Sequence, residues 1–317
     1  MPEALAVLSA PAILAPLAAA WAFLLSATGI VAAIARGRPT RDTSELWDRT
    51  RTWWWIIGIV SAAMLLGPKA TILLTSALSF LAFREFHSIV PVRRSDRVIL
   101  GLAYLAIPVQ FWLVWTAWYG LFTIFLPVYA FTIVAASTVC SGETRGFIRS
   151  TATLHWALML TVYNLSHLAY LTVLPLASAA PAGGVGVLLF VLIVVQFNDV
   201  AQFVWGRSFG RRKIVPSVSP GKTWEGFIGG AVTTAGLSVL LAPWLVPFDL
   251  AGAASLGLLL AVVGFFGDVT LSAVKRDLGI KDTGSSLPGH GGVLDRLDSL
   301  TLSAPIAFHI IRYFYGA

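Results

Sequence analysis

Long, almost uncharged segments dominate this chain and restrict what it can fold into. Of its 317 residues, 57% are hydrophobic and only 12% are charged, whereas soluble domains carry roughly 25% charged residues. The mean hydropathy is +0.81. We therefore expect an all-α, polytopic integral membrane protein with a single membrane-embedded domain over residues 1–317.

Ten apolar segments alternate with polar connections along the sequence. They are residues 8–34, 53–67, 70–83, 98–116, 119–139, 154–178, 185–205, 225–246, 252–275 and 299–315. A straight crossing of the bilayer needs about 20 helical residues. Segments 53–67 and 70–83 are short for that, so they are expected to form a tight helical hairpin or to be re-entrant. The sequence thus predicts about nine to ten transmembrane helices.

The basic residues indicate which side of the membrane each connection faces. Twenty of the 22 Lys and Arg residues fall within residues 36–51, 84–97, 145–149, 207–222 and 275–296. The connections between these five patches are nearly free of basic residues. The positive-inside rule places all five basic loops in the cytoplasm and both termini outside. This placement indicates a membrane protein with no nucleic-acid partner, in spite of a net charge of +7.

One polar stretch, Ser272 to Asp298, stands out in an otherwise apolar sequence, and polar residues in membrane proteins mark functional sites. Asp268, Ser272 and Lys275 are spaced to share one helical face, and Asp295 and Asp298 share another. Carboxylates from two helix ends can hold Mg²⁺, which prefers oxygen ligands. The alternative is that Asp268 pairs with a neighbouring Arg and joins two helices.

A glycine-rich segment, Pro288 to Gly292, lies inside this stretch. Glycines allow backbone N–H groups to approach phosphate oxygens, and His290 adds a donor. The alternative is a flexible turn without a ligand. The adjoining acidic and basic residues favour a phosphate site.

Two further motifs lie upstream. Asn198 and Asp199 end a long apolar segment, where an ionisable residue is a functional candidate. In the segment from Ser219 to Gly226, Ser219 is expected to cap a helix that begins near Pro220, and Lys222 adds positive charge to that helix end. Gly226 and Gly230 form a GxxxG pattern, which favours close helix packing.

The first 140 residues carry little recognisable chemistry, and we expect them to supply scaffold or lipid-facing helices. Trp53, Trp54 and Trp55 are interpreted as an aromatic anchor at the cytoplasmic interface. The sequence thus suggests an N-terminal helical scaffold over residues 1–180 and a catalytic core over residues 185–317.

The polar stretch resembles the signature of the phosphatidate cytidylyltransferases, or CDP-diacylglycerol synthases. The matching residues are Ser272, Val274-Lys275-Arg276, Lys281-Asp282, Gly284, Leu287-Pro288, His290-Gly291-Gly292-Val293 and Asp295-Arg296-Leu297-Asp298. The motifs around Asp199 to Gly210 and Ser219 to Gly226 are similar to family motifs as well. The resemblance covers about residues 195–300. One segment departs from it, because bacterial members usually read Asp-Thr-Gly-Ala-Tyr-Phe where this chain reads Asp199-Val200-Ala201-Gln202-Phe203-Val204.

The resemblance implies transfer of the cytidylyl group of CTP to phosphatidic acid by a multi-pass inner-membrane enzyme. It implies Mg²⁺ with a monovalent cation such as K⁺, a homodimer and an active site facing the cytoplasm. The implied catalytic residues are Asp268, Lys275, Arg276, His290, Asp295 and Arg296. The implied metal ligands are Asp268, Asp295 and Asp298. The implied substrate-binding residues are Asn198, Asp199, Arg207, Ser219, Lys222, Thr223, Glu225, Ser272, Lys281, Asp282, Gly291 and Gly292.

Two other functions remain open at this point. A CTP-dependent lipid kinase of the polyprenol or phytol type would transfer the γ-phosphoryl group and release CDP. A transporter would use Asp199 and Asp268 as pathway residues, although transporters usually show internal repeats and broken helices at mid-membrane.

Overall fold

The computed structural model describes residues 11–37, 42–91, 93, 96–176 and 181–317. Some predicted features lie outside these residues. They are the start of segment 8–34, the basic residues Arg38, Arg41 and Arg94, residues 177–178 at the end of segment 154–178, and positions 179–180 of the connection before segment 185–205.

The regular elements of the described residues are all helices, with no β-strand, which confirms the predicted fold class. The helices are α2 (Pro11–Gly37), α3 (Ser44–Leu65), α4 (Pro68–Ile89), α5 (Arg97–Trp115), α6 (Tyr119–Ile124), η2 (Phe125–Ala130), α7 (Phe131–Cys140), α8 (Phe147–Leu158), η3 (Met159–Tyr163), α9 (Asn164–Leu171), α10 (Gly183–Phe209), α11 (Trp224–Leu245), α12 (Leu250–Asp277) and α13 (Leu294–Tyr315). The π-helical turns η2 and η3 continue their neighbours without a break. Pro127 lies within η2, where it lacks the N–H that a regular α-turn would use.

Seven helical stretches of the described chain are long and apolar enough to cross a membrane. They are α2, α4, α5, the continuous α6–η2–α7, α10, α11 and α12. Helices also occupy the other three predicted positions, as α3, α8–η3–α9 and α13. Because those three are not among the helices that are long and apolar enough to cross a membrane, the predicted total of nine to ten crossings stays a prediction.

The two segments that looked too short are each part of a longer helix. Helices α3 and α4 have 22 residues apiece, which corresponds to about 33 Å of rise. Each continues beyond its apolar window into polar sequence. Between them Gly67 adopts a φ of 97°, and Pro68 begins α4, where a missing N–H costs nothing.

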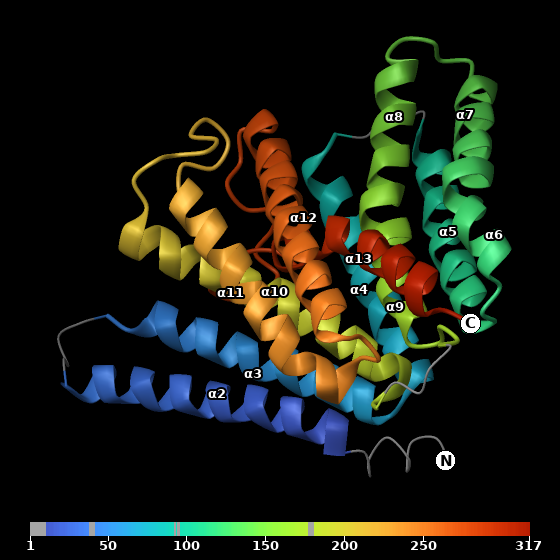
Figure 1. Ribbon diagram of the computed structural model, residues 1–317. Coiled ribbons are helices and arrows are strands. Elements are labelled where there is room, and N and C mark those ends of the chain that lie inside the picture. The colour runs from blue at the N-terminus through green and yellow to red at the C-terminus, as the bar shows by residue number, and fades with distance from the viewer. Residues whose placement is uncertain (1–10, 38–41, 92, 94–95, 177–180) are drawn as a thin grey trace.

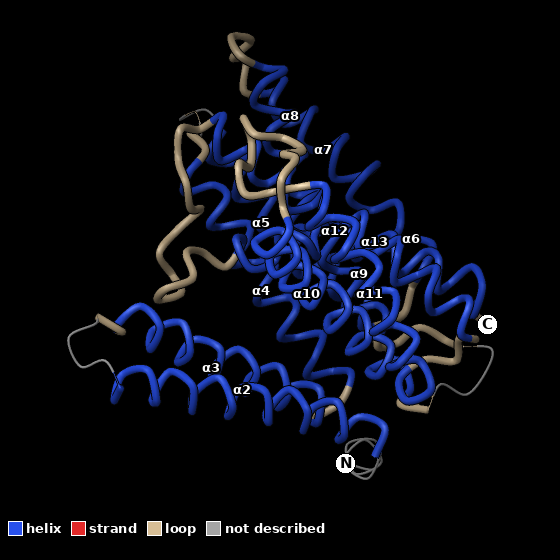
Figure 2. Tube along the Cα trace, turned by 60° about the vertical axis from the view of Figure 1, so that its left-hand side comes forward, coloured by secondary structure: helices blue, strands red, loops and turns tan. Residues whose placement is uncertain are grey.

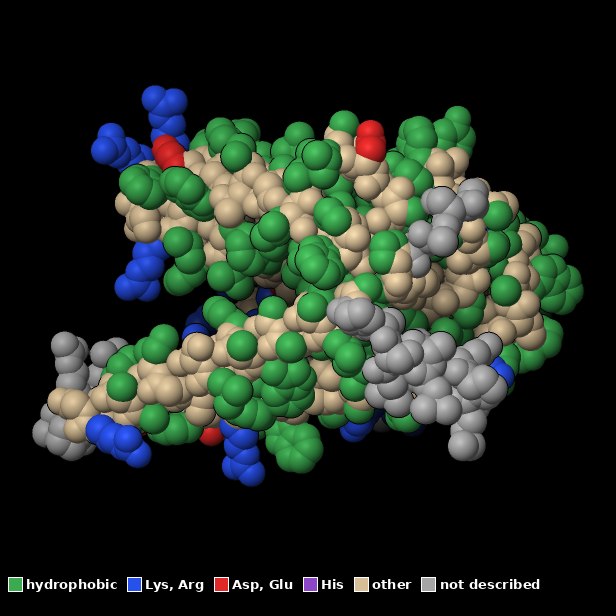
Figure 3. Space-filling view, turned by 60° about the horizontal axis from the view of Figure 1, so that its bottom comes forward, with side chains coloured by type: hydrophobic (Ala, Val, Ile, Leu, Met, Phe, Trp, Pro, Cys, Tyr) green, Lys and Arg blue, Asp and Glu red, His purple; other side chains and the backbone are tan. Residues whose placement is uncertain are grey.

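Figure 1 shows how the connections are distributed in space. The basic loops α4–α5, α7–α8, α10–α11 and α12–α13 lie toward the top and upper left, and the non-basic turns α3–α4, α5–α6 and α11–α12 lie toward the bottom and right. Helices α2 and α3 form a hairpin that is strongly inclined to α7 and α8, as Figure 2 also shows. Hydrophobic side chains are spread over the face in Figure 3, and Lys and Arg gather mainly at one end of it.

Glycines allow α10 and α11 to approach closely, as the GxxxG pattern predicted. A Cβ atom at Gly230 would lie 2.5 Å from Cγ of Gln202, and one at Gly226 would lie 2.8 Å from the backbone oxygen of the same residue. Helix α12 packs onto α13 in a similar way, since a Cβ at Gly267 would lie 2.6 Å from the backbone oxygen of Asp298. These contacts bring the four motif-bearing helices together in two pairs, α10 with α11 and α12 with α13.

Candidate active site

Three carboxylates from different helices gather where α10, α12 and α13 meet. Asp199 lies on α10, Asp268 on α12 and Asp298 on α13. Asp298 is close enough to the other two for their charges to interact, and Asp199 also interacts with Asp268. Ser299 donates a hydrogen bond to Oδ2 of Asp199 at 2.8 Å, while Oδ1 of Asp199 is buried without a partner.

Lys222 brings positive charge to this carboxylate cluster. Its Nζ lies 2.6 Å from Oδ2 of Asp268 and donates to Oε1 of Gln202 at 3.2 Å. Ser272, one turn after Asp268, donates to its Oδ1 at 3.3 Å. The alternative interpretation, in which Asp268 pairs with an arginine, is wrong as to the partner, because the basic residue is Lys222.

A second acid–base pair lies beside the cluster. Lys275 Nζ contacts Oδ1 of Asp295 at 2.8 Å. Oδ2 of Asp295 accepts hydrogen bonds from the backbone N–H groups of Thr283 at 2.8 Å and Gly292 at 3.0 Å. Burial alone would raise the pKa of Asp295, but these donors and Lys275 hold it below its ordinary value. Both oxygens of Asp295 are therefore engaged by protein donors.

Glu85 on α4 completes the same network, and the sequence interpretation did not include it. This carboxylate is 7% exposed. It accepts hydrogen bonds from the N–H of Val293 at 2.9 Å and of Leu294 at 3.0 Å, and from the hydroxyl of Thr283. Glu85 thus holds the first turn of α13, where negative charge is favourable. An ionisable residue near the end of an apolar segment was the available signal.

Helix α3 holds the glycine-rich segment from the other side. Thr52 donates to the backbone oxygen of Pro288 at 2.8 Å. The ring of Trp53 packs edge-on against the ring of His290, with 5.9 Å between the two ring centroids. Trp53 therefore contacts the signature, in addition to its expected position near the interface. Burial lowers the pKa of His290, the Pro288 carbonyl raises it, and the charges of Arg296 and Arg49 lower it further.

The glycines of this segment make room for carboxylates and side chains. Gly291 has a φ of 78°, and a Cβ there would lie 2.8 Å from Oδ2 of Asp295. A Cβ on Gly292 would overlap Oε1 of Glu85. The N–H groups of residues 292–294 donate to Glu85 and Asp295. The expectation that the glycines free backbone donors for phosphate is thus corrected at Gly292, whose N–H donates to Asp295. The expectation stays a prediction for Gly289 and Gly291.

The α10–α11 loop is organised differently from the prediction. Helix α11 begins at Trp224. Thr223 is its N-cap, and the side chain of Thr223 accepts from the N–H of Gly226 at 3.2 Å. Ser219 instead lies in a turn in which its backbone oxygen accepts from the N–H of Lys222. Glu225 accepts from the N–H of Arg211 at 2.9 Å. The predicted cap at Ser219 is therefore wrong, because the chain turns through the loop before the helix starts.

Other predicted residues have structural contacts or face the solvent. Asn198 is fully buried, where it donates to the backbone oxygen of Ala261 and accepts from Thr234, so it joins α10, α11 and α12. Arg276 donates to the backbone oxygen of Val218 at 3.3 Å. The exposed members of the predicted set are Arg207, Arg276, Lys281, Asp282 and Arg296. The catalytic roles of Arg276 and Arg296 and the substrate-binding roles of Arg207, Lys281 and Asp282 stay predictions.

The donor set of the carboxylate cluster suits a divalent cation. Among the residues that the structure describes, no three His, Cys, Asp or Glu side chains are positioned to enclose a metal ion. Mg²⁺ commonly uses only one or two carboxylates together with water and substrate phosphates. The unpartnered Oδ1 of Asp199, beside Asp268 and Asp298, meets that requirement. Asp295 is less available, since its oxygens already accept four hydrogen bonds.

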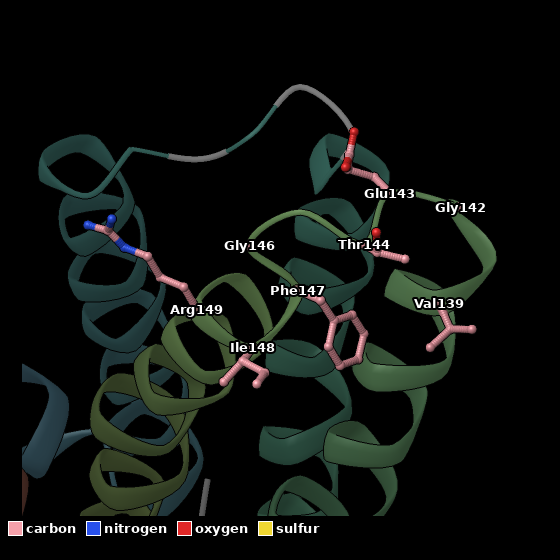
Figure 4. A pocket seen from close by; sticks show the side chains of 8 residues that line it. All are labelled: Val139, Gly142, Glu143, Thr144, Gly146, Phe147, Ile148 and Arg149. Atoms are coloured by element: carbon pink, nitrogen blue, oxygen red, sulfur yellow. The ribbon is translucent and has the colours of Figure 1, made fainter.

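A cavity of about 770 Å³ opens elsewhere, at the α7–α8 turn. Figure 4 shows its lining, in which Phe147, Ile148 and Val139 lie among Glu143 and Arg149. None of the predicted site residues lines it. This cavity therefore adds no group to the cluster described above.

Comparison with known proteins identifies the class. The model of the cytidylyltransferase family matches residues 47–314. The chain therefore belongs to the cytidylyltransferase family, and with its long apolar helices it is a multi-pass membrane protein.

Individual relatives fall into two groups. The Escherichia coli strain K12 protein named "Uncharacterized protein YnbB" is 40% identical over 94% of this chain and 97% of its own length. The phosphatidate cytidylyltransferase of Haemophilus influenzae is 40% identical over 43% of this chain and 47% of its own length. That of Mycobacterium tuberculosis strain H37Rv is 41% identical over 41% of this chain and 40% of its own. The chain thus matches less than half the length of each of these two phosphatidate cytidylyltransferases.

Proposed function

We propose that this protein transfers the cytidylyl group of CTP to phosphatidic acid, giving CDP-diacylglycerol and pyrophosphate. The observation that carries the proposal is the acid–base cluster of Asp199, Asp268 and Asp298 with Lys222. Such a cluster offers negative charge to a metal and positive charge to phosphates in one place. The family and the phosphatidate cytidylyltransferases among the relatives support the same reaction.

The chemistry requires positioning and charge neutralisation more than proton transfer. A non-bridging oxygen of the lipid phosphate attacks the α-phosphorus of CTP, the bond from that phosphorus to the β-phosphate oxygen breaks, and pyrophosphate leaves. A phosphomonoester is largely dianionic near neutral pH, since its second pKa is about 6, so a strong general base is unnecessary. Lys222, Lys275 and Arg296 would offset the charge that develops on the phosphates.

The acidic residues would hold the divalent cation. Asp268 and Asp298 are the predicted ligands that remain most available, and Asp199 adds a third oxygen donor. When bound, Mg²⁺ would neutralise phosphate charge and act as a Lewis acid. An accompanying K⁺ stays a prediction. Asp295 would orient Lys275 and the glycine-rich segment through its hydrogen bonds.

The location of the reaction follows from the charges. The basic loops would lie in the cytoplasm, where CTP is available, and would raise the local concentration of anions. Phosphatidic acid would reach the cluster from the inner leaflet of the inner membrane. The homodimer implied by the resemblance is part of this proposal.

The experiment that tests the proposal uses purified protein, phosphatidic acid, Mg²⁺ and CTP labelled at either the α- or the γ-phosphate. The proposed reaction moves the α label to lipid and releases pyrophosphate. Transfer of the γ label with release of CDP would instead establish the lipid-kinase function. If neither label reached lipid, both enzyme proposals would fail and a transport assay would follow.

A further inference from the structure

Gln202 is the residue at which this chain departs most in chemistry from the usual bacterial motif, and it lies inside the candidate site. The side chain is 4% exposed on α10, three residues after Asp199 and so on the same helical face. Glycines of α11 make space for it, because a Cβ on Gly230 would lie 2.5 Å from its Cγ. An alanine at position 202 would leave that space unfilled.

The contact with Lys222 fixes which way the amide points. Nζ of Lys222 can only donate, so Oε1 of Gln202 faces it at 3.2 Å. The amide nitrogen then faces away from Lys222. This Nε2 is buried and has no hydrogen-bond partner. Buried donors are almost always satisfied in folded proteins, and an exception calls for an explanation.

The neighbouring atoms indicate what the free donor binds. Oδ1 of Asp199, which is also buried without a partner, lies one turn earlier on the same helix. A carboxylate oxygen suits a cation, and an amide N–H suits an anion. The flanking residues Val200 and Phe203 are 52% and 64% exposed, so this part of α10 borders the lipid phase. A phosphate on a membrane lipid is an anion that can accept from the amide N–H, and it lies at the edge of the lipid phase.

We propose that Gln202 is a specificity-determining residue whose amide N–H donates to a non-bridging oxygen of the acceptor lipid phosphate. Lys222 contacts the same amide and Asp268, so it orients the donor. This inference rests on the proposed function and names the part of the site that selects the lipid. CTP binding does not use this donor.

Two substitutions separate substrate binding from a purely structural role. Gln202→Glu keeps an oxygen for Lys222 but removes the N–H donor, whereas Gln202→Ala removes both. Because Gln202→Glu also adds a negative charge beside Lys222, the decisive variant is Gln202→Ala. If Gln202 only held Lys222 in place, Gln202→Ala would weaken the binding of CTP and of lipid alike. If the donor binds lipid phosphate, both variants bind lipid more weakly.

The readouts are equilibrium dialysis of dioctanoyl phosphatidic acid against the full-length protein in detergent, and KM values for CTP and lipid. Loss of a hydrogen bond to a charged oxygen should weaken lipid binding about tenfold or more, with KM for CTP changed less than about twofold. Lipid binding by Gln202→Ala at the wild-type level, or equal changes for CTP and lipid, would overturn the proposal.

Gln110→Leu serves as the matched control, because Gln110 on α5 is also buried and its Nε2 already donates to Ser166 at 3.1 Å. It should lower thermal stability without changing lipid binding. The dialysis needs no CTP. If the wild type transferred no cytidylyl group, the proposed function would fail, and the comparison of lipid binding would still decide the role of Gln202.

Discussion

Helices α10–α13 and helices α2–α9 both contribute to the candidate site, but in different ways. The C-terminal four, with the loop between α10 and α11, supply the residues that would meet metal and substrate, namely Asp199, Lys222, Asp268 and Asp298. The N-terminal helices supply Glu85 and Thr52, which bond to the backbone around the glycine-rich segment. A short signature therefore depends on distant helices to fix its shape.

The contrast also shows why one half carries recognisable motifs. Groups that bind phosphate or metal must be particular side chains in a particular order. Groups that hold a backbone need only place an acceptor or donor correctly, which many sequences can do. The prediction of a scaffold over residues 1–180 described that half's composition but missed its hydrogen bonds to the signature.

The largest effect is expected for Asp268→Asn, in the C-terminal half. It removes the negative charge opposite Lys222 and one predicted metal ligand, so cytidylyl transfer should fall about 100- to 1,000-fold. The measurement is the rate of α-label transfer by purified variant. Asp277→Asn, at the exposed end of the same helix, is the control. Near-normal turnover by Asp268→Asn would remove Asp268 from the site.

Glu85→Ala tests most directly whether the N-terminal helices control the site, because Glu85 lies on α4 and contacts the first turn of α13. It leaves the N–H groups of Val293 and Leu294 without their acceptor, and each unsatisfied buried group should lower the free energy of unfolding by about 1–3 kcal/mol. We expect transfer to fall about 10- to 100-fold, together with a lower thermal midpoint. Glu45→Gln is the matched control, since Glu45 makes an exposed ion pair with Arg49. Such surface pairs contribute little to stability. Unchanged activity in Glu85→Ala would mean that α4 does not control the signature.

A smaller effect is expected for Thr52→Val. This change removes the hydrogen bond from α3 to Pro288 and should cost about 1 kcal/mol, with activity lowered a few-fold. Thr50→Val is the matched control, because the hydroxyl of Thr50 donates to the backbone oxygen of Leu46 in its own helix. The pair is compared by thermal unfolding and turnover. Equal effects in both variants would show that the bond between the two halves has no special role.

The smallest effect is expected for His290→Gln. Burial and the charges of Arg296 and Arg49 keep the pKa of His290 below its ordinary value in spite of the Pro288 carbonyl. The ring is thus mostly neutral at pH 7, and it becomes half protonated only at a pH below that ordinary value. A neutral amide should replace it within about threefold, and the rate profile between pH 7 and 8 should be unchanged. A new pH dependence of the rate in that range would contradict the conclusion that the His290 ring acts in its neutral form.

Much of the architecture was predictable from local patterns. Apolar runs located the helices, and the GxxxG pattern anticipated the close contact of α10 with α11. The lengths of α3 and α4 were underestimated, because a helix continues through polar residues once its backbone bonds are formed, whereas hydropathy marks only the apolar part. The cap at Ser219 was wrong because a serine before a proline is also typical of a turn.

The sequence by itself determined the membrane class, the helical fold and the identity of the acidic and basic groups near the phosphate chemistry. Only the tertiary structure decided their pairing: Lys222 with Asp268, Lys275 with Asp295, and Glu85 with a helix end more than 200 residues later. Helical periodicity shows which residues share a face of one helix. Ion pairs and hydrogen bonds between helices depend on positions within a few tenths of an ångström, and those are set by how the helices pack.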